Sequence, residues 1–149
     1  MTRWLDDDEQ RTWRAFMATS QLVNEELDRQ LQRDSGMPHT YYVVLMKLSE
    51  APDRMLRMSE LAMELNSSQS RLSHAVARLE ERGWVQRRPC ATDRRVSWAF
   101  LTDEGFAVLA AAAPGHTEAV RQSFFDRLTP EQVRQLAEIC EAVLGKADS

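Results

Sequence analysis

The segment from Ser59 to Gly83 constrains the fold of this chain most, because its pattern is that of two short helices separated by a tight break. Ser59 can cap the first helix, and Asn66 can cap the second, with Gln69 in the position of a capping-box partner. Gly83 is placed to end the second helix, since glycine readily takes the left-handed conformation found after helix C-termini. Two helices this close together predict a helix-turn-helix.

A β-hairpin is predicted directly after this pair. Residues 84–90 and 96–101 have the composition of strands, and the five residues between them form a charged turn. Thr102 can then cap a further helix. Together with a short extended stretch at Arg57 and Met58, the hairpin predicts a winged helix-turn-helix.

Amphipathic helices flank this centre. No helix breaker occurs from about residue 8 to residue 33, where apolar residues recur every three or four positions: Trp13, Met17, Val23, Leu27 and Leu31. The last helix opens with a cap, a proline at the first helical position and a capping-box glutamine, at Thr129, Pro130 and Gln132. A chain of 149 residues leaves little room for another domain to cover these stripes. We therefore expect the same helices of a second chain to cover them in an isologous dimer.

The predicted fold class is therefore mainly α with a small β-hairpin wing. Residues 36–102 are predicted to form a winged helix-turn-helix lobe. Residues 1–35 and 103–149 are predicted to form N- and C-terminal dimerisation helices, and all three segments belong to one intertwined domain.

Charge separates along the chain, although the net charge is −4. The window from Ser67 to Trp98 holds seven arginines and three acidic residues and carries +4, so the remainder carries −8. A run of arginines is ordinarily a solvated face, but this run coincides with the predicted helix-turn-helix and hairpin. One basic face on an otherwise acidic protein is typical of proteins that bind nucleic-acid phosphates.

Several other classes of protein are not indicated. The longest apolar run, residues 106–113, is far shorter than the ~20 residues of a membrane span, and the acidic start at residues 6–9 does not resemble a signal peptide. Cys90 and Cys140 cannot form a disulfide framework, so a cytoplasmic protein without membrane association is expected. No metal-ligand spacing, phosphate-binding loop or nucleophile motif occurs. We therefore expect no metal, no cofactor and no enzymatic activity.

The predicted helix at residues 67–82 has a narrow polar face. At about 100° per residue, Ser70, His74 and Ala77 lie opposite the apolar positions, with arginines at the margins. A helix must be slim on this side to enter a DNA major groove, which is ~12 Å wide. An ordinary solvent face is the alternative, but such a face more often carries Glu and Lys. We therefore predict that this helix reads base edges.

The hairpin supplies a second predicted contact, since arginines at its tip can reach the minor groove, whose negative potential favours arginine. Asp93 is expected to hold the shape of the wing by accepting a hydrogen bond from Arg94 or from a turn amide. Four other arginines are expected mainly to hold phosphates: Arg71, Arg78, Arg87 and Arg88. The full set of candidate DNA-contacting residues is Ser67, Ser68, Gln69, Ser70, Arg71, Ser73, His74, Arg78, Arg87, Arg88, Arg94 and Arg95.

These motifs resemble those of the MarR family of winged helix-turn-helix transcriptional regulators. The wing matches at D-R-R of residues 93–95 and at the strand and threonine that follow. The helix pair matches at Leu61, Ala62, Leu65, Ser70, Leu72, Val76, Leu79, Glu80, Arg82, Gly83, Trp84 and Val85, and the last helix at Leu128, Thr129, Pro130 and Glu131. The resemblance implies a homodimer that binds double-stranded DNA at a pseudo-palindromic operator, commonly as a repressor relieved by a small ligand or by oxidation. It also implies that residues 67–74 read bases and that Arg94 enters the minor groove.

The resemblance further implies an effector pocket between the dimerisation helices and the DNA-binding lobe, for a small and aromatic ligand. Its candidate lining residues are Trp13, Met17, His39, Tyr41, Tyr42 and Met46. A stripe of aromatic residues and methionines is also typical of plain core. For oxidation sensing, Cys90 is the candidate, with a small strand residue as the alternative, and Cys140 is expected in the core.

A protein-interaction module without autonomous DNA binding is the alternative function. It would require an apolar or acidic outward face on the second helix of the pair. The small polar face between arginines favours DNA binding instead.

Overall fold

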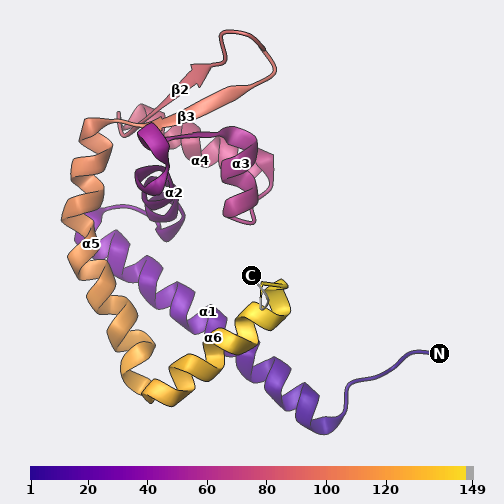
Figure 1. The fold of residues 1–149 in the computed structure, drawn as a ribbon. Coiled ribbons are helices and arrows are strands. Elements are labelled where there is room, and N and C mark those ends of the chain that lie inside the picture. Colours follow the sequence, from indigo (N-terminus) through magenta and orange to yellow (C-terminus); the bar gives the residue numbers. More distant parts are fainter. Residues whose placement is uncertain (147–149) are drawn as a thin grey trace. The chain divides into compact units, whose positions relative to one another are not determined.

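The computed structural model describes residues 1–146 (Figure 1). In chain order the elements are α1 (Asp7–Ser35), α2 (His39–Glu50), a 3-10 turn (Pro52–Arg54), β1 (Met55–Arg57), α3 (Met58–Glu64), α4 (Gln69–Glu81), β2 (Val85–Pro89), β3 (Ser97–Leu101), α5 (Asp103–Ser123), a second 3-10 turn (Phe125–Arg127) and α6 (Pro130–Leu144). The predicted fold class is confirmed, because these residues are mostly helical and carry a three-stranded antiparallel sheet. Residues 147–149, the end of the predicted segment 103–149, lie outside the described residues. No helix within residues 1–146 has the length and apolar character that crossing a membrane requires.

The chain forms two compact units, and α1 and α5 each contribute to both. The winged-helix unit comprises residues 28–115, from the end of α1 to the middle of α5. The terminal-helix unit comprises residues 1–27 and 116–146, with the rest of α1 and α5 and the whole of α6. The winged-helix unit thus extends beyond the predicted lobe of residues 36–102 at both ends.

The hydrophobic core belongs to the winged-helix unit. Its largest fully buried side chains come from successive segments between α1 and β3: Leu31, Met37, Val44, Leu45, Leu48, Leu61, Val76, Leu79, Val85 and Leu101. Helix α4 meets this core with one stripe, since Leu72, Val76 and Leu79 recur at helical spacing and are buried. The core therefore fixes one face of α4 and leaves the other face to solvent.

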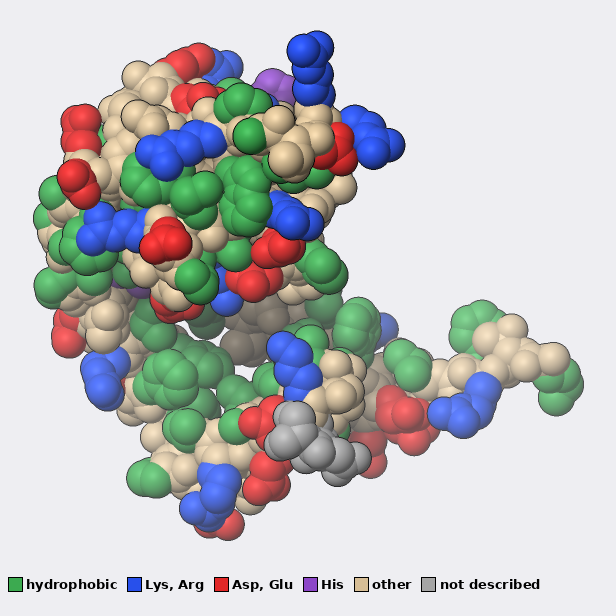
Figure 2. Space-filling model, turned by 45° about the horizontal axis from the view of Figure 1, so that its top comes forward, with side chains coloured by type: hydrophobic (Ala, Val, Ile, Leu, Met, Phe, Trp, Pro, Cys, Tyr) green, Lys and Arg blue, Asp and Glu red, His purple; other side chains and the backbone are tan. Residues whose placement is uncertain are grey.

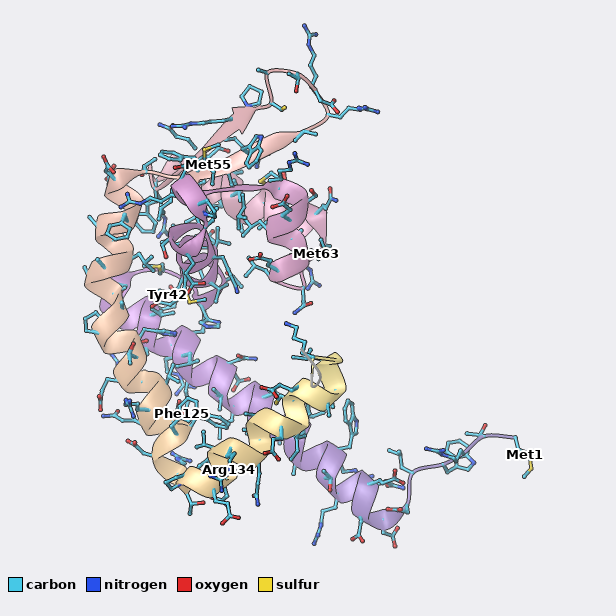
Figure 3. The ribbon with its side chains drawn as sticks, viewed as in Figure 1. Met1, Tyr42, Met55, Met63, Phe125 and Arg134 are labelled. Atoms are coloured by element: carbon cyan, nitrogen blue, oxygen red, sulfur yellow. The ribbon has the colours of Figure 1, made fainter. Side chains whose placement is uncertain are left out.

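The sheet has the strand order β1-β3-β2 and is antiparallel throughout. Central β3 pairs with β1, where Met55, labelled in Figure 3, lies opposite Phe100. Strand β1 leads directly into α3, which begins at Met58 with Arg57 as its N-cap residue. The predicted cap at Ser59 is therefore wrong, because Ser59 already lies in the first turn of α3.

The cap predicted for α4 is also wrong by two residues. Ser68, and not Asn66, is the N-cap, since its Oγ accepts a hydrogen bond of 3.1 Å from the Arg71 amide. Asn66 instead has φ 51° and closes α3, and the next amide, of Ser67, donates to the carbonyl of Ala62 at 2.9 Å. Asparagine takes the left-handed conformation more readily than most residues, so it ends one helix here and does not begin the next.

Gly83 and the cap of α5 are as predicted. Gly83 has φ 78° after α4, and the Oγ1 of Thr102 accepts a hydrogen bond of 3.0 Å from the Gly105 amide. Gly105 has no space for a side chain, since a Cβ there would collide with the carbonyl oxygen of Trp84. This close approach holds the start of α5 against the chain that joins α4 to β2.

The terminal-helix unit has almost no core of its own. Among residues 1–27 and 116–146, Leu27 alone is buried. Helix α6 begins as predicted with a reciprocal capping box between Thr129 and Gln132. However, Ile139 and Val143 on its apolar side are 59% and 83% exposed. The unit therefore presents apolar surface that its own residues do not cover.

Candidate DNA interface

The exposed side of α4 carries the residues predicted to contact DNA. We call it the reading face and define it as Ser70, Arg71, His74 and Arg78, all of which are exposed. Gln69, at the start of the helix, is exposed as well, whereas Ser67 and Ser73 are half-buried. Because the opposite stripe is locked in the core, the reading face is held toward solvent.

The two serines before α4 shape the turn that presents this helix. The Ser68 hydroxyl accepts the capping bond from Arg71, and the Ser67 hydroxyl donates to the Ser68 carbonyl at 3.0 Å. Both were predicted as DNA contacts only. Because the sequence predicts the cap at Asn66, it indicates no structural role for these two serines.

Two arginines belong to the reading face and lie at one edge of it. Within residues 1–146 the Arg71 guanidinium makes no hydrogen bond or ion pair. Arg78 pairs with Glu81 at 3.2 Å, but both side chains are more than half exposed, so water screens this pair and it is weak. Both guanidinium groups are therefore available to an approaching anion.

The wing tip distinguishes its two arginines. The Asp93 carboxylate accepts a hydrogen bond of 2.9 Å from the Arg95 amide and pairs with the Arg95 guanidinium at 3.2 Å. The side-chain hydrogen bond from Arg95 is the main reason that the pKa of Asp93 is lowered. The predicted hydrogen bond from a turn amide to Asp93 is confirmed, and the side chain that pairs with Asp93 is that of Arg95 and not that of Arg94.

Arg94 is consequently the unengaged arginine of the wing. It is exposed, and among the described residues 1–146 its guanidinium has no hydrogen-bonding or ionic partner. Figure 2 shows basic side chains that project from the surface at the wing. A projecting guanidinium without internal partners is well suited to enter a narrow anionic groove.

Arg87 and Arg88 of β2 lie against other parts of the winged-helix unit. Arg87 donates to the Ser73 carbonyl at 2.8 Å, and its Nε lies 3.1 Å from a carboxylate oxygen of Glu80. Arg88 stacks on Phe100, with its guanidinium carbon 3.8 Å from the ring centroid. Both groups are thus engaged within the protein, and their phosphate contacts stay a prediction.

Glu80 was missed as a member of this site. The available signal is its spacing, since Ser73 and Glu80 are seven residues apart and therefore lie on the same side of a helix. Nothing in the sequence places β2 beside that side of α4. The contact with Arg87 depends on tertiary packing and was therefore not predictable.

The six predicted effector-pocket residues are divided between the two units. Trp13 and Met17 belong to the terminal-helix unit and are about half exposed. In the winged-helix unit, Tyr42 is buried in the core, and Tyr41 and Met46 pack against it. His39 is half-buried, and burial lowers the pKa of its imidazole. The contacts of Tyr41, Tyr42 and Met46 fit the plain-core alternative, and the effector pocket stays a prediction.

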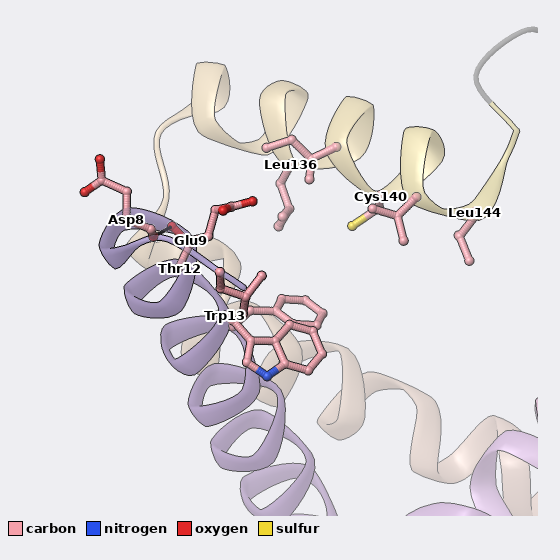
Figure 4. Close-up of a pocket in the computed structure, with 11 residues that line it drawn as sticks. Asp8, Glu9, Thr12, Trp13, Leu136, Cys140 and Leu144 are labelled. Carbon is pink, nitrogen blue, oxygen red and sulfur yellow. Dashed lines mark hydrogen bonds between the residues drawn. The ribbon is translucent and has the colours of Figure 1, made fainter. Parts of the chain in front are cut away.

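An apolar groove of about 790 Å³ lies between the start of α1 and α6, within the terminal-helix unit (Figure 4). Trp13 lines it from α1, and Leu136 and Cys140 line it from α6, together with Leu5, Phe16, Ile139, Val143 and Leu144. Its polar lining residues are Asp8, Glu9 and Thr12. The expectation that Cys140 is buried in the core is wrong, because Cys140 is exposed on this uncovered side of α6.

Cys90 lies where β2 enters the wing turn. Its Sγ is 3.3 Å from the Thr92 Oγ1. Hydrogen bonds from the Thr92 hydroxyl and then from the backbone of Thr92 and Asp93 lower the pKa of the thiol. The sensor role and the plain strand role of Cys90 both stay predictions. No three His, Cys, Asp or Glu side chains within residues 1–146 come together as a metal site would require.

Comparisons with known proteins agree with this geometry. The MarR family model matches residues 35–96. The transcriptional regulator HosA of Escherichia coli O127:H6 is 31% identical over 120 residues, which cover 80% of this chain and 86% of HosA. The transcriptional repressor MprA of Escherichia coli K12 is 28% identical over 113 residues, or 76% of this chain, and the chain spans 64% of the length of MprA.

A solved structure is still more similar. A MarR family transcriptional regulator from Streptomyces coelicolor, in complex with DNA, is 56% identical, with a TM-score of 0.91 and coverage of 96% of this chain and 90% of that chain. The chain described here belongs to the MarR family. These relatives are transcriptional regulators, in agreement with the prediction that the chain is not an enzyme.

Proposed function

We propose that this protein is a sequence-specific DNA-binding transcriptional regulator. The observation that carries the proposal is the exposed reading face of α4, held outward by the core, beside a wing whose Arg94 has no partner within residues 1–146. A slim polar helix face fits the major groove, and a projecting arginine fits the adjacent minor groove. The similarity to a regulator solved in complex with DNA supports the same assignment.

The proposed contacts divide into positioning and reading. Arg71, Arg78 and Arg94 bind phosphates or the minor groove, so they supply affinity that depends on salt more than on sequence. Ser70 and His74 at the centre of the reading face contact base edges and supply sequence preference.

The active form in this proposal is a homodimer. The terminal-helix unit buries only Leu27 among its described residues, and it leaves an apolar groove of about 790 Å³ open on α6. Apolar surface of this kind is normally covered in the working assembly. In an isologous dimer the same helices of a second copy cover it, and the two reading faces enter successive major grooves ~34 Å apart at a pseudo-palindromic operator.

Repression with release by a small effector completes the proposal. The repressor assignment is supported by the name of the relative MprA. An effector acts only through its different affinities for the two states, and a tenfold difference corresponds to about 1.4 kcal/mol. Small aromatic compounds that release DNA and quench the tryptophan fluorescence of the unmodified protein, but not that of Trp13→Phe, would support the pocket; equal quenching in Trp13→Phe would contradict a ligand at Trp13.

Binding to DNA from upstream of the protein's own gene, titrated against salt, tests the function. We expect selective binding that falls about 10³- to 10⁵-fold between about 50 and about 200 mM salt, as for a dimer with several phosphate contacts. A well-folded dimer without selective binding at any salt concentration would overturn the proposal and favour the protein-interaction module.

A further inference from the structure

Arg87, on strand β2 of the wing, contacts helix α4 at two points. Its guanidinium donates to the carbonyl of Ser73 at 2.8 Å, and its Nε lies 3.1 Å from a carboxylate oxygen of Glu80. The Arg87 backbone amide also donates to the Glu80 carboxylate at 3.4 Å. The Arg87 side chain is 32% exposed and the Glu80 side chain 37%, so most of this contact is shielded from solvent. A shielded charge pair with hydrogen bonds is more strongly held than a surface pair.

The position of these contacts on α4 determines what they can do. At about 100° per residue, Ser73 and Glu80 lie on one side of the line through Ser70 and His74. Arg71 and Arg78 lie on the other side of that line. Arg87 contacts one side of α4 at two residues that are seven positions apart. Two such contacts oppose rotation of the helix about its axis and sliding of the helix along it. Arg87 belongs to β2, which pairs with β3 to form the wing.

We propose that Arg87 is a positioning residue, which with Glu80 fixes the orientation of the reading face relative to the wing. The inference rests on the proposed function and deepens it. The major-groove contacts of α4 and the minor-groove contact of Arg94 must be made at one register on the duplex. Arg87 keeps these two surfaces in that register and does not itself bind a phosphate.

The alternative role, a phosphate contact by Arg87, predicts opposite effects at Glu80. If Arg87 held a phosphate, removal of the competing carboxylate would free its guanidinium and reduce repulsion of DNA. The Glu80→Ala variant would then bind DNA more tightly. If Arg87 is a positioning residue, the same change removes its anchor, and selective binding becomes weaker despite the loss of a negative charge.

Glu81 provides the matched control. Glu81→Ala removes the same charge from the next residue of α4, and Glu81 contacts Arg78 and not Arg87. We expect Glu80→Ala to weaken operator binding about tenfold, with unchanged binding to unrelated DNA. Glu81→Ala is expected to bind both DNAs at least as tightly as the unmodified protein. Equal or tighter operator binding by Glu80→Ala would overturn the proposal.

Two variants at Arg87 give a second, independent test. Lysine can still hold a phosphate as a point charge but lacks the planar group that spans Ser73 and Glu80. We expect Arg87→Lys to lose selectivity as Arg87→Ala does, with the double variant Glu80→Ala/Arg87→Ala no weaker than Arg87→Ala alone. The slope of log K against log salt should stay unchanged in Arg87→Ala. A slope smaller by about 2, one phosphate per protomer, would show that Arg87 binds phosphate and overturn the proposal.

The selective binding of the unmodified protein is measured first and tests the proposed function alone. Thermal unfolding followed by circular dichroism confirms that each variant is folded. If only the Glu80 and Arg87 variants lose selectivity, the loss supports the positioning role. A general loss of structure would also reduce binding to unrelated DNA.

Discussion

The hydroxyl of Thr102 donates a hydrogen bond of 2.7 Å to the carbonyl of Gly83. The same oxygen accepts the Gly105 amide at 3.0 Å, and the Thr102 amide donates to the Trp84 carbonyl at 3.1 Å. One side chain therefore joins the end of α4 to the start of α5, across the base of the hairpin. Since α4 carries the reading face, this junction contributes directly to the geometry of the candidate DNA interface.

Replacement of Thr102 should destabilise the protein measurably. Thr102→Ala removes the cap of α5 and leaves the Gly83 carbonyl without this donor, so we expect a loss of about 1–3 kcal/mol in the free energy of unfolding. Urea unfolding at fixed protein concentration measures the free energy of unfolding. Thr102→Ser keeps the hydroxyl, so its free energy of unfolding should fall much less. A loss in Thr102→Ala no larger than in Thr129→Ala, which removes only an exposed cap, would contradict the role of the Gly83 bond.

The two arginines of the wing tip should differ in their effects on DNA binding. Arg94 lacks a partner within residues 1–146, whereas Arg95 is held by Asp93. We expect Arg94→Ala to weaken binding to all DNA sequences about tenfold and to reduce the salt slope by about 2 per dimer. Arg95→Ala should have a smaller effect on the affinity and on the salt slope. Fluorescence anisotropy at several salt concentrations measures both quantities. An unchanged salt slope in Arg94→Ala would contradict the proposed contact of the wing with DNA.

Substitutions at the centre of the reading face should change preference among sequences. Ser70 and His74 are exposed there, and a contact with one base edge is typically worth about 1–3 kcal/mol of discrimination. We expect His74→Ala to relax the preference at one operator position by about 5- to 100-fold. Arg71→Ala should instead weaken all sequences alike. Binding to a set of single-base operator variants distinguishes these patterns, and uniform weakening in His74→Ala would exclude base reading by that residue.

A charge placed in the apolar groove should disrupt the dimer. Ile139 lines the groove and is 59% exposed in the single chain, so Ile139→Asp would bury a carboxylate in the proposed interface. Burial of an unpaired charge costs several kcal/mol, enough to weaken association by more than about 100-fold. Analytical ultracentrifugation measures the change. Ala137→Asp, an exposed position of α6 outside the groove lining, is the control. An unchanged dimer in Ile139→Asp would show that the groove is not the interface.

Much of the fold was predictable because its signals are local. A cap and its partner are three residues apart, as at Thr129 and Gln132, and the apolar stripe of α4 repeats every three or four residues. The prediction of the α4 cap was wrong because two neighbouring residues both suit that position. Asn66 and Ser68 both suit a helix N-terminus, and the left-handed closure of α3 by Asn66 left the cap of α4 to Ser68.

The candidate site was predictable as a set of residues but not as a set of roles. Residue types and their spacing identify a basic helix face and a basic wing tip, because charge and helical period are properties of neighbouring positions. Whether a guanidinium meets solvent or another part of the protein depends on contacts between distant segments. Arg94 and Arg95 are adjacent, yet only Arg95 turns back to Asp93, and Arg87 reaches α4 across the packing of β2 on that helix. Tertiary packing decided which arginines are available to DNA, since a long flexible side chain takes its partner from whatever the fold brings within its reach.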